Sequence, residues 1–345
     1  MISPGVAEQA PSSPPGLAPE RLQRLVHQAV ADCRLDLRGR TVLTEAATGA
    51  YFVTPVLAAL AGAEVLAVTR ESRYGTVRAV TELTMALARR CGVDERVRVL
   101  DGVSPDVVGR ADVITNSGHL RPLDARIVAW MKPGAVVPLM FEAWELQAGR
   151  VDVDLEALRA RGIATAGTNE RHPDVDVFSY LGMMAVKALH EAGIPVYRSH
   201  IGLLCDNPFR THLERGLSSC GATVHAAGSW QALDRHAPLD AVLVAMTPTG
   251  RFVVDAAAAH ELADAWPGAT VVQYWGDVDR ESLSGEGIEV WPALEPFAGH
   301  MAVLPSDIGP DPIVRLQAGG LKVGQVLLTP PAERTAADIA FLDER

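Results

Sequence analysis

Short apolar runs alternate with longer amphipathic stretches along most of this chain. An apolar run bounded by turn residues indicates a buried strand, whereas apolar positions three and four residues apart indicate a helix. On this basis the first clear unit is a strand at 41–44, a helix at 53–62 and a second strand at 64–69. A strand, a helix and a parallel strand within about thirty residues predict the βαβ unit that opens a nucleotide-binding sheet.

The same alternation continues over the first half of the chain, which we assign to a dinucleotide-binding domain at 20–174. An amphipathic helix at 20–34 precedes the opening unit. After that unit, the pattern predicts a helix at 76–91, strands at 97–100, 111–115, 135–140 and 163–166, and helices at 122–131 and 152–161, the last capped by Asp152. Six strands alternating with helices predict a complete α/β doubly wound, Rossmann-like sheet.

A second alternation follows a long helix at 175–192, which lies in a connecting segment at 175–198. Strands are predicted at 201–205, 223–227, 241–245, 270–274 and 288–291. They predict a smaller, flavodoxin-like domain at 199–308, which we expect to face the first domain across a cleft. A last helix at 310–328, in the C-terminal segment 309–345, is expected to return to the first domain, although Gly319 and Gly320 each cost it about 1 kcal/mol relative to alanine.

Composition is that of a soluble globular protein, with 48% hydrophobic and 21% charged residues. The net charge of −11 argues against binding to nucleic acid or to an anionic membrane. No apolar stretch reaches the roughly eighteen residues of a membrane span. Residues 1–19 are rich in proline, serine and alanine but lack the basic and apolar regions of a signal peptide, so we expect a disordered lead.

The four cysteines have no C-x-x-C spacing, and a reduced, cytoplasmic protein is the simplest explanation. No His or Cys pair has the spacing of metal ligands, so no metal site is predicted. The expected partner is a small-molecule substrate, with neither nucleic acid nor membrane, and a homodimer is left open.

The turn after the first strand is the first candidate site. It contains Thr48, Gly49, Ala50 and Tyr51 and leads into a helix N-terminus, whose free N–H groups and positive dipole favour a phosphate. The dinucleotide fingerprint G-x-G-x-x-G has three glycines, whereas this turn has Gly49 alone. An ordinary turn that binds nothing is therefore the alternative interpretation.

The second strand ends in a basic segment that bears on the choice of cofactor. An acidic residue at this place usually binds the ribose hydroxyls of NAD, and an arginine accommodates the 2′-phosphate of NADP. Here Arg70, Ser72 and Arg73 favour NADP, while Glu71 keeps NAD open.

The residues after the fourth predicted strand carry a family resemblance. The segments 111–119 (ADVITNSGH) and 131–137 (MKPGAVV) resemble the strand-four to strand-five region of the D-2-hydroxyacid dehydrogenases and S-adenosylhomocysteine hydrolases. The resemblance implies a Rossmann-fold, NAD(P)-dependent oxidoreductase, with Asn116, Ser117 and Gly118 beside the nicotinamide ring. Gly299 and His300 similarly resemble the region of the dehydrogenases' catalytic histidine.

Hydride transfer needs a group that exchanges a proton with the substrate, and histidine suits this task because its ordinary pKa lies near neutrality. We choose His300, with His172 and His119 as the next candidates. Glu142 and Glu145 could hold an amine or tune a proton donor, but they are neighbours only if their segment is helical. Other polar residues at strand ends are assigned to substrate binding in the cleft: Glu145, Asn169, Glu170, Asp206, Asn207 and Met301. Lys322 is expected on the surface.

The leading hypothesis is an NAD(P)-dependent oxidoreductase that transfers a hydride to or from a small polar metabolite, of hydroxy, keto, amino or imino acid type, in the interdomain cleft. One alternative is a two-domain transferase of glycosyltransferase type that uses a sugar nucleotide. The other is a cofactor-independent lyase, isomerase or binding module that kept the sheet but lost the dinucleotide.

Overall fold

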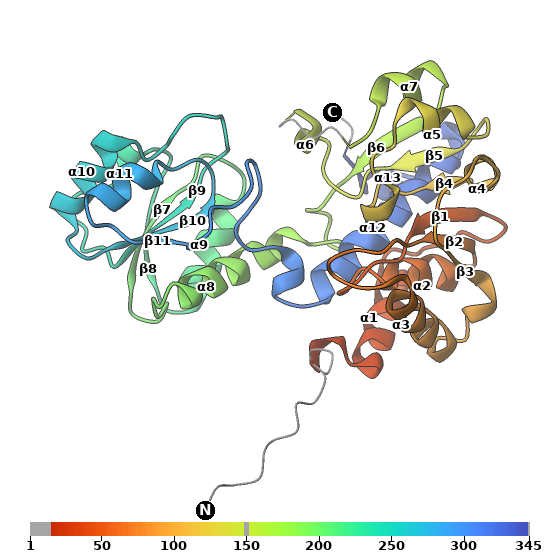
Figure 1. The fold of residues 1–345 in the computed structure, drawn as a ribbon, viewed down its shortest axis with the longest axis horizontal. Coiled ribbons are helices and arrows are strands. Elements are labelled where there is room, and N and C mark those ends of the chain that lie inside the picture. The colour runs from red at the N-terminus through yellow and green to blue at the C-terminus, as the bar shows by residue number, and fades with distance from the viewer. Residues whose placement is uncertain (1–14, 148–151, 344–345) are drawn as a thin grey trace, which may run out of the picture. The chain divides into compact units, whose positions relative to one another are not determined.

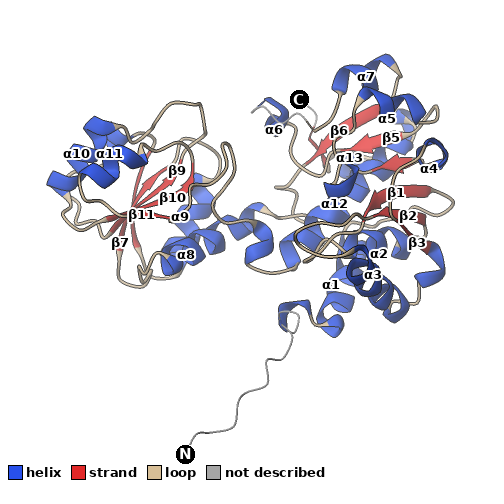
Figure 2. Ribbon diagram, viewed as in Figure 1, coloured by secondary structure: helices blue, strands red, loops and turns tan. Residues whose placement is uncertain are grey.

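The computed structural model describes residues 15–147 and 152–343. The chain divides into two compact units. The first comprises Met1–Ala143, Val151–Asn169 and Gly309–Arg345, and the second comprises Trp144–Arg150 and Glu170–Ile308. Both units are α/β, with a central sheet and surrounding helices (Figures 1 and 2).

The first unit contains a seven-stranded sheet with the order β12-β6-β5-β4-β1-β2-β3. Its strands are β1 (Thr41–Glu45), β2 (Glu64–Val68), β3 (Val97–Leu100), β4 (Val113–Ile114), β5 (Val136–Pro138), β6 (Ala164–Thr168) and β12 (Leu342–Asp343). The first six are parallel, and their order 3-2-1-4-5-6 is that of the dinucleotide-binding fold. The predicted six-stranded Rossmann-like sheet is thus confirmed, and β12 adds an antiparallel seventh strand beside β6.

Two groups of helices accompany this sheet, as a doubly wound fold requires. The first group is α1 (Pro19–Asp32), α2 (Val53–Leu60), α3 (Val77–Arg90) and α12 (Asp311–Leu328). The second group is α4 (Pro105–Arg110), α5 (Ala125–Trp130) and α7 (Leu155–Ala160). Side-chain caps begin several of them: Thr76 accepts a hydrogen bond from the N–H of Ala79, and Asp154, not Asp152, caps α7.

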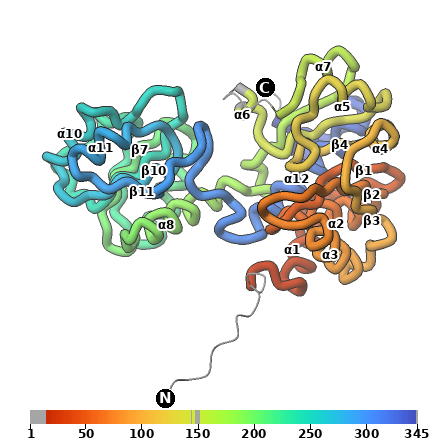
Figure 3. The backbone as a smooth tube through the Cα atoms, viewed as in Figure 1, coloured from red at the N-terminus to blue at the C-terminus, as the bar shows by residue number. Residues whose placement is uncertain are grey.

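Helix α12 packs against β5, β6 and α2, so the blue C-terminal segment in Figure 3 lies among elements from the first half of the chain. Two glycines allow this close approach. A Cβ added at Gly320 would lie 2.2 Å from Sδ of Met140, and one at Gly324 would lie 2.8 Å from Cγ1 of Val113. The glycines therefore serve packing, and the helix continues through them without a break.

The second unit has a five-stranded parallel sheet with the order β11-β10-β9-β7-β8. Its strands are β7 (His200–Leu204), β8 (Thr223–Ala227), β9 (Ala241–Ala245), β10 (Thr270–Trp275) and β11 (Val290–Trp291). In order of appearance this is 2-1-3-4-5, the flavodoxin-like arrangement that the sequence predicted. Its helices are α6 (Trp144–Gln147), α8 (Leu181–Glu191), α9 (Arg210–Ser219), α10 (Ala256–Ala265) and α11 (Arg280–Gly285).

Some predicted boundaries are wrong. The lead was extended to residue 19, but Pro15–Leu17 form a 3-10 turn and α1 starts at Pro19; residues 1–14 lie outside the described part of the chain. The helix expected from residue 175 begins at Leu181, because Asp176 adopts a left-handed φ of 45° that interrupts helical backbone. Short elements α4, α11, α13 (Ala336–Ile339) and β12 were not foreseen.

The four cysteines, all in the part of the chain that the structure describes, form no disulfide with one another, and Cys33 and Cys205 are buried. Within the described residues, no helix is both long and apolar enough to cross a membrane.

Candidate functional site

Strands β1 and β4 are neighbours in the first sheet, although β2 and β3 lie between them in sequence. The chain winds in opposite directions from this point, and ligands of open α/β sheets bind at the carboxyl ends of the strands there. The loops after β1, β2, β3 and β4 therefore form the first place to look for a site.

The turn after β1 presents unused backbone donors. In the described part of the chain, the N–H groups of residues 47–50 donate no hydrogen bond. Gly49 has a left-handed φ of 68°, which glycine adopts without strain, and a Cβ added there would meet open space. Helix α2 follows without a side-chain cap. The predicted turn thus has the free donors that an anion needs.

The loop after β2 folds back onto this turn. Ser72 and Gly75 exchange two backbone hydrogen bonds, and a Cβ added at Gly75 would lie 2.5 Å from Cγ2 of Thr48. The hydroxyl of Ser72 accepts a hydrogen bond from the N–H of Tyr74. The carboxylate of Glu71 accepts one from the N–H of Val77, in the first turn of α3. The carboxylate of Glu71, the residue that leaves NAD as an alternative cofactor, is therefore already hydrogen-bonded to a helix N-terminus.

The two arginines of this loop have different surroundings. The guanidinium of Arg70 donates to the carbonyl of His119, in the loop after β4. That of Arg73 stacks on the ring of its neighbour Tyr74, 4.7 Å from the centroid. Arg70 bridges two loops of the carboxyl edge, whereas Arg73 is held by its own loop.

A pocket of about 300 Å³ opens beside Arg70. It is lined by residues after β2, β3 and β4 and by the start of α5: Arg70, Gly102, Val103, His119, Leu120, Arg121, Pro122, Asp124, Arg126 and Ile127. Three arginines in one pocket are notable in a chain with a net charge of −11. We did not identify Arg121 and Arg126 from the sequence, where the only signal was three basic residues within 119–126.

The three arginines differ in how many of their contacts are already made within the protein. Arg121 forms an ion pair with Asp152, with 3.0 Å between Nε and Oδ2, and also donates to the side chain of Asn116 at 2.9 Å. Arg126 lies 4.0 Å from Asp124 and over the ring of Trp130. Burial, and the nearby charge of Arg70, lower the pKa of His119 below its usual value, which favours the neutral imidazole at pH 7. The positive charge of the pocket therefore comes from its arginines.

The side chains of Asn116 and Ser117, which the resemblance places beside a cofactor, are buried. The amide of Asn116 bonds with Arg121 and, at 3.4 Å, with Asp152. The hydroxyl of Ser117 lies 2.7 Å from that of Thr115. These side chains hold the loop after β4 in place, so a contact with a cofactor remains a prediction that concerns the exposed backbone at Gly118.

Glu45, the last residue of β1, is a functional candidate that the sequence analysis missed. Its side chain is 3% exposed, and Oε2 accepts a hydrogen bond of 3.1 Å from the N–H of His119. Burial raises the pKa of this carboxyl, and the hydrogen bond and the charge of Arg121 oppose that effect only in part. In sequence it is indistinguishable from the first polar residue of a loop.

The carboxylates after β5 are not a helical pair. Glu142 is buried and precedes α6, which begins at Trp144, while Glu145 lies within that helix. The condition that would have placed them side by side is therefore not met. Asn169 donates to the carbonyl of Ala340 at 2.9 Å, and the carbonyl of Glu170 accepts from the N–H of Val177.

In the second unit, the predicted substrate residues after β7 are engaged with the neighbouring strand. Oδ1 of Asp206 accepts hydrogen bonds from the N–H and hydroxyl of Thr247, at 2.8 and 3.1 Å. The amide of Asn207 donates to the carbonyl of Ala245 at 2.8 Å. Together they connect the loops after β7 and β9.

Two of the three candidate histidines, His300 and His172, belong to the second unit, whereas His119 belongs to the first. His300 is exposed, with Nδ1 3.2 Å from the carbonyl of Ala298, and Met301 packs against the core. The side chain of His172 is 13% exposed, and its Nδ1 accepts a hydrogen bond from the N–H of Asp174. His300 is thus accessible, whereas His172 is built into a turn.

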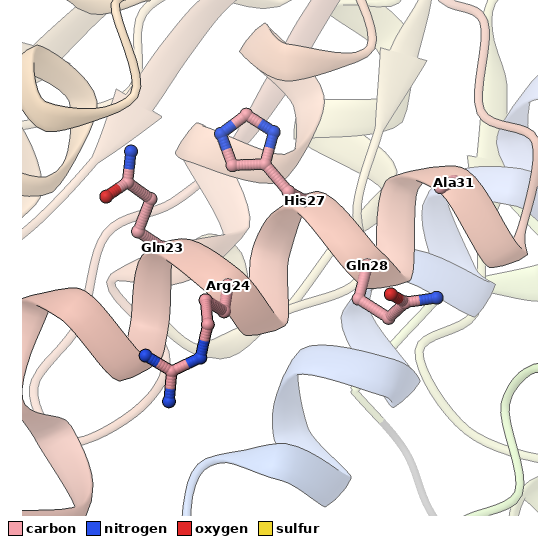
Figure 4. A pocket seen from close by; sticks show the side chains of 5 residues that line it. All are labelled: Gln23, Arg24, His27, Gln28 and Ala31. Atoms are coloured by element: carbon pink, nitrogen blue, oxygen red, sulfur yellow. The ribbon is translucent and has the colours of Figure 1, made fainter.

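A second hollow, of about 440 Å³, lies along α1 (Figure 4). Its lining comes from this one helix: Gln23, Arg24, His27, Gln28 and Ala31. It brings together no separate elements and includes no strand end, so it is not a candidate for the main site.

Comparison with protein-family models and with curated proteins gives no match. Solved structures do match. A dipicolinate synthase polypeptide from Bacillus halodurans is 13% identical, and the match covers 86% of this chain and 100% of that one with a TM-score of 0.56. Its counterpart in the dipicolinate synthase from Bacillus subtilis is 10% identical, with coverage of 83% and 95% and a TM-score of 0.53. At these identities the likeness shows a shared fold, and it confirms the Rossmann-like resemblance at that level.

Proposed function

We propose that this protein is an NAD(P)-dependent oxidoreductase that binds its nucleotide at the carboxyl edge of the first sheet. One observation carries the proposal: the β1/β4 edge combines a turn of unused N–H donors with an arginine-lined pocket. Such an edge is where nucleotides bind in this fold. Two separate anion-binding features fit a ligand with phosphates at two places.

The residues present fit the two ends of such a cofactor. The N–H groups of residues 47–50 would hold the pyrophosphate. The pocket would take the adenosine end, with Arg70 and Arg126 directed to a 2′-phosphate. We therefore infer a preference for NADP that rests on Arg70 and Arg126, with Arg73 in a lesser role because it is held against Tyr74.

A bound nicotinamide would supply the hydride acceptor or donor. The chain itself must then exchange the substrate proton, and His300 is our candidate because it is exposed and because an imidazole is the side chain best suited to proton exchange near neutral pH. We propose a small polar acid as the substrate class. In support, the two similar structures are of a synthase of dipicolinate, itself a small dicarboxylate.

Titration of the purified protein with NADPH and NADH, followed by nicotinamide fluorescence, tests the proposal. We expect tighter binding of NADPH in the wild-type protein. Arg70→Ala and Arg126→Ala should each weaken NADPH binding by about ten- to a hundredfold and leave NADH nearly unchanged, since a charge-assisted hydrogen bond contributes roughly 1.5–3 kcal/mol. Arg73→Ala is the matched control from the same loop and should have a smaller effect.

Failure of both nucleotides to bind at millimolar concentration would contradict the proposal. In that case a thermal-stability panel separates the alternatives. Protection by sugar nucleotides alone indicates the transferase, and no protection by either panel indicates the cofactor-independent enzyme or binding module. A ligand at about 100 times its Kd stabilises the fold by about 2.7 kcal/mol, which such a panel detects.

A further inference from the structure

Glu45 occupies the centre of the proposed site. It ends β1, the strand that lies between β2 and β4, and it directly precedes the turn whose N–H groups are free. A carboxylate is an unexpected residue here, because the phosphates proposed to bind at this turn carry the same sign of charge. Either the carboxyl is neutral when the nucleotide is bound, or it opposes binding.

The surroundings of Glu45 favour the neutral form. Its side chain is 3% exposed, and the hydrogen bond that it accepts comes from an uncharged backbone donor, the N–H of His119. The backbone of Gly118 covers it: a Cβ added there would lie 1.7 Å from Oε2 of Glu45. Burial of a carboxylate with so little compensation disfavours its ionised form.

Charged groups on the adjoining elements do not neutralise it. On the β4 side these are His119 and Arg121, and Arg121 is paired with Asp152 at 3.0 Å. At the end of β2 it is Arg70, whose guanidinium reaches the carbonyl of His119. The remaining groups are Asp106 and Arg110 on α4 and Glu64 at the start of β2, and α2 has no titratable side chain.

We propose that Glu45 takes up a proton from solvent when the pyrophosphate of a nucleotide binds at the turn after β1, so that nucleotide affinity depends on the protonation of this carboxyl. This inference rests on the proposed function. The proton neutralises this carboxylate next to the proposed phosphate site, and it is released again when the nucleotide leaves. Affinity therefore falls as pH rises through the pKa of Glu45, by up to tenfold for each pH unit above it.

Isothermal calorimetry tests this linkage with NADP and NAD between pH about 5.5 and about 9. Pairs of buffers with different heats of ionisation report the protons taken up per nucleotide. The wild-type protein should take up as much as one proton at pH values above the pKa of Glu45, with Kd rising over the same interval. Glu45→Gln keeps the shape and the hydrogen-bond acceptor, and should bind without proton uptake and with a Kd that changes little with pH.

His119→Gln is the control, because His119 lines the pocket and its backbone N–H donates to Glu45, and this variant should retain the proton uptake. The inference is overturned if the wild-type protein binds nucleotide without taking up a proton, or if proton uptake persists in Glu45→Gln and disappears in His119→Gln. Wild-type proton uptake needs no variant, so the test holds even if Glu45→Gln does not fold. Absence of binding by both nucleotides at every pH contradicts the proposed function itself, whereas tight binding with no proton uptake contradicts this inference alone.

Discussion

At the scale of single residues, Gly49 carries the clearest prediction. It has a φ of 68° and open space around an added Cβ, so Gly49→Val strains the backbone without a steric clash. Gly39 has a φ of 73° and similar open space, but it precedes the amino end of β1. Both variants should lose about 1–2 kcal/mol of stability. Only Gly49→Val should weaken NADPH binding, by more than about tenfold, because it distorts the N–H groups of residues 47–50.

Fluorescence titration of NADPH and thermal denaturation of the two variants supply the comparison. Equal loss of stability with a selective loss of affinity in Gly49→Val supports the phosphate site at this turn. If folded Gly49→Val binds NADPH as Gly39→Val does, the nucleotide binds elsewhere.

Glu45 predicts a pH-dependent stability. Burial raises its pKa in the folded state above the ordinary value of 4.5, so the folded protein holds this proton more tightly than the unfolded chain. The stabilisation from this group is complete below pH about 4.5 and is lost as pH rises through the raised pKa. Glutamine cannot lose a proton, so Glu45→Gln should gain in Tm relative to the wild type as pH rises. Thermal denaturation at a series of pH values measures this difference in Tm, and Glu95→Gln, at an exposed position, is the control. A difference in Tm between Glu45→Gln and the wild type that does not vary with pH would be evidence against the raised pKa.

At the scale of elements, the C-terminal segment is attached through a buried cation. Lys322 in α12 is 4% exposed rather than on the surface as the sequence suggested, and its Nζ lies 2.8 Å from Oδ1 of Asp338. Lys322 and Thr335 hold the pKa of Asp338 at about 2. The segment that contains Asp338 leads into β12, which pairs with β6. The ion pair thus connects α12 to α13, the short helix that precedes the last strand of the sheet.

Removing either partner of this pair should have unequal effects. Asp338→Ala leaves the ammonium of Lys322 buried without its anion, which should cost about 3 kcal/mol or more. Lys322→Met fills the same space with an apolar chain and leaves Asp338, whose side chain is 29% exposed, to water, so its cost should be smaller. Denaturant unfolding at pH about 7 measures both. Because the pKa of Asp338 is lowered, its contribution should be lost as pH falls from about 4 towards 2, and equal destabilisation by the two variants would contradict this account.

The elements that the sequence predicted well are those with enough residues to show a pattern. Strand β3 at 97–100 and strand β9 at 241–245 agree with their predicted limits. Strand β12 has two residues and exists because Leu342 pairs with Thr168, a contact over a long sequence separation that no local pattern reveals. Lys322 was misplaced because one charged residue on a helix does not show whether a partner such as Asp338 will cover it.

At the scale of the whole molecule, local sequence patterns likewise do not reveal those parts of the site that come together only in the folded protein. The turn at Gly49 is local and was predicted, whereas the pocket depends on three loops that meet only in the folded sheet. Arg126 therefore could not be identified before the fold was known. Glu45 was missed for a different reason: a carboxylate at the end of an apolar strand gives no sign of whether it will be buried.

The two units also differ in how accessible each sheet is at the place where its strand order reverses. In the second sheet the strand order reverses between β7 and β9. There, Oδ1 of Asp206 accepts hydrogen bonds from the N–H and the hydroxyl of Thr247. That crevice is bridged by the chain's own side chains and carries a negative group. In the first sheet the N–H groups after β1 are unused and arginines line the pocket. The nucleotide should therefore bind to the first unit.

Hydrogen exchange measured by mass spectrometry distinguishes the units directly. Saturating NADPH should slow exchange in the peptides that contain residues 46–54, 69–76, 101–105 and 116–127. At an NADPH concentration of about 100 times the Kd, exchange should slow by up to about a hundredfold for those amides that exchange only when the site opens. Peptides with residues 205–209 and 246–250 should exchange as before. Protection of the second set of peptides and not of the first would place the nucleotide at the β7/β9 edge. Arg70→Ala is the control: it should reduce protection only at the edge of the first sheet, which shows that the protection comes from binding at that edge.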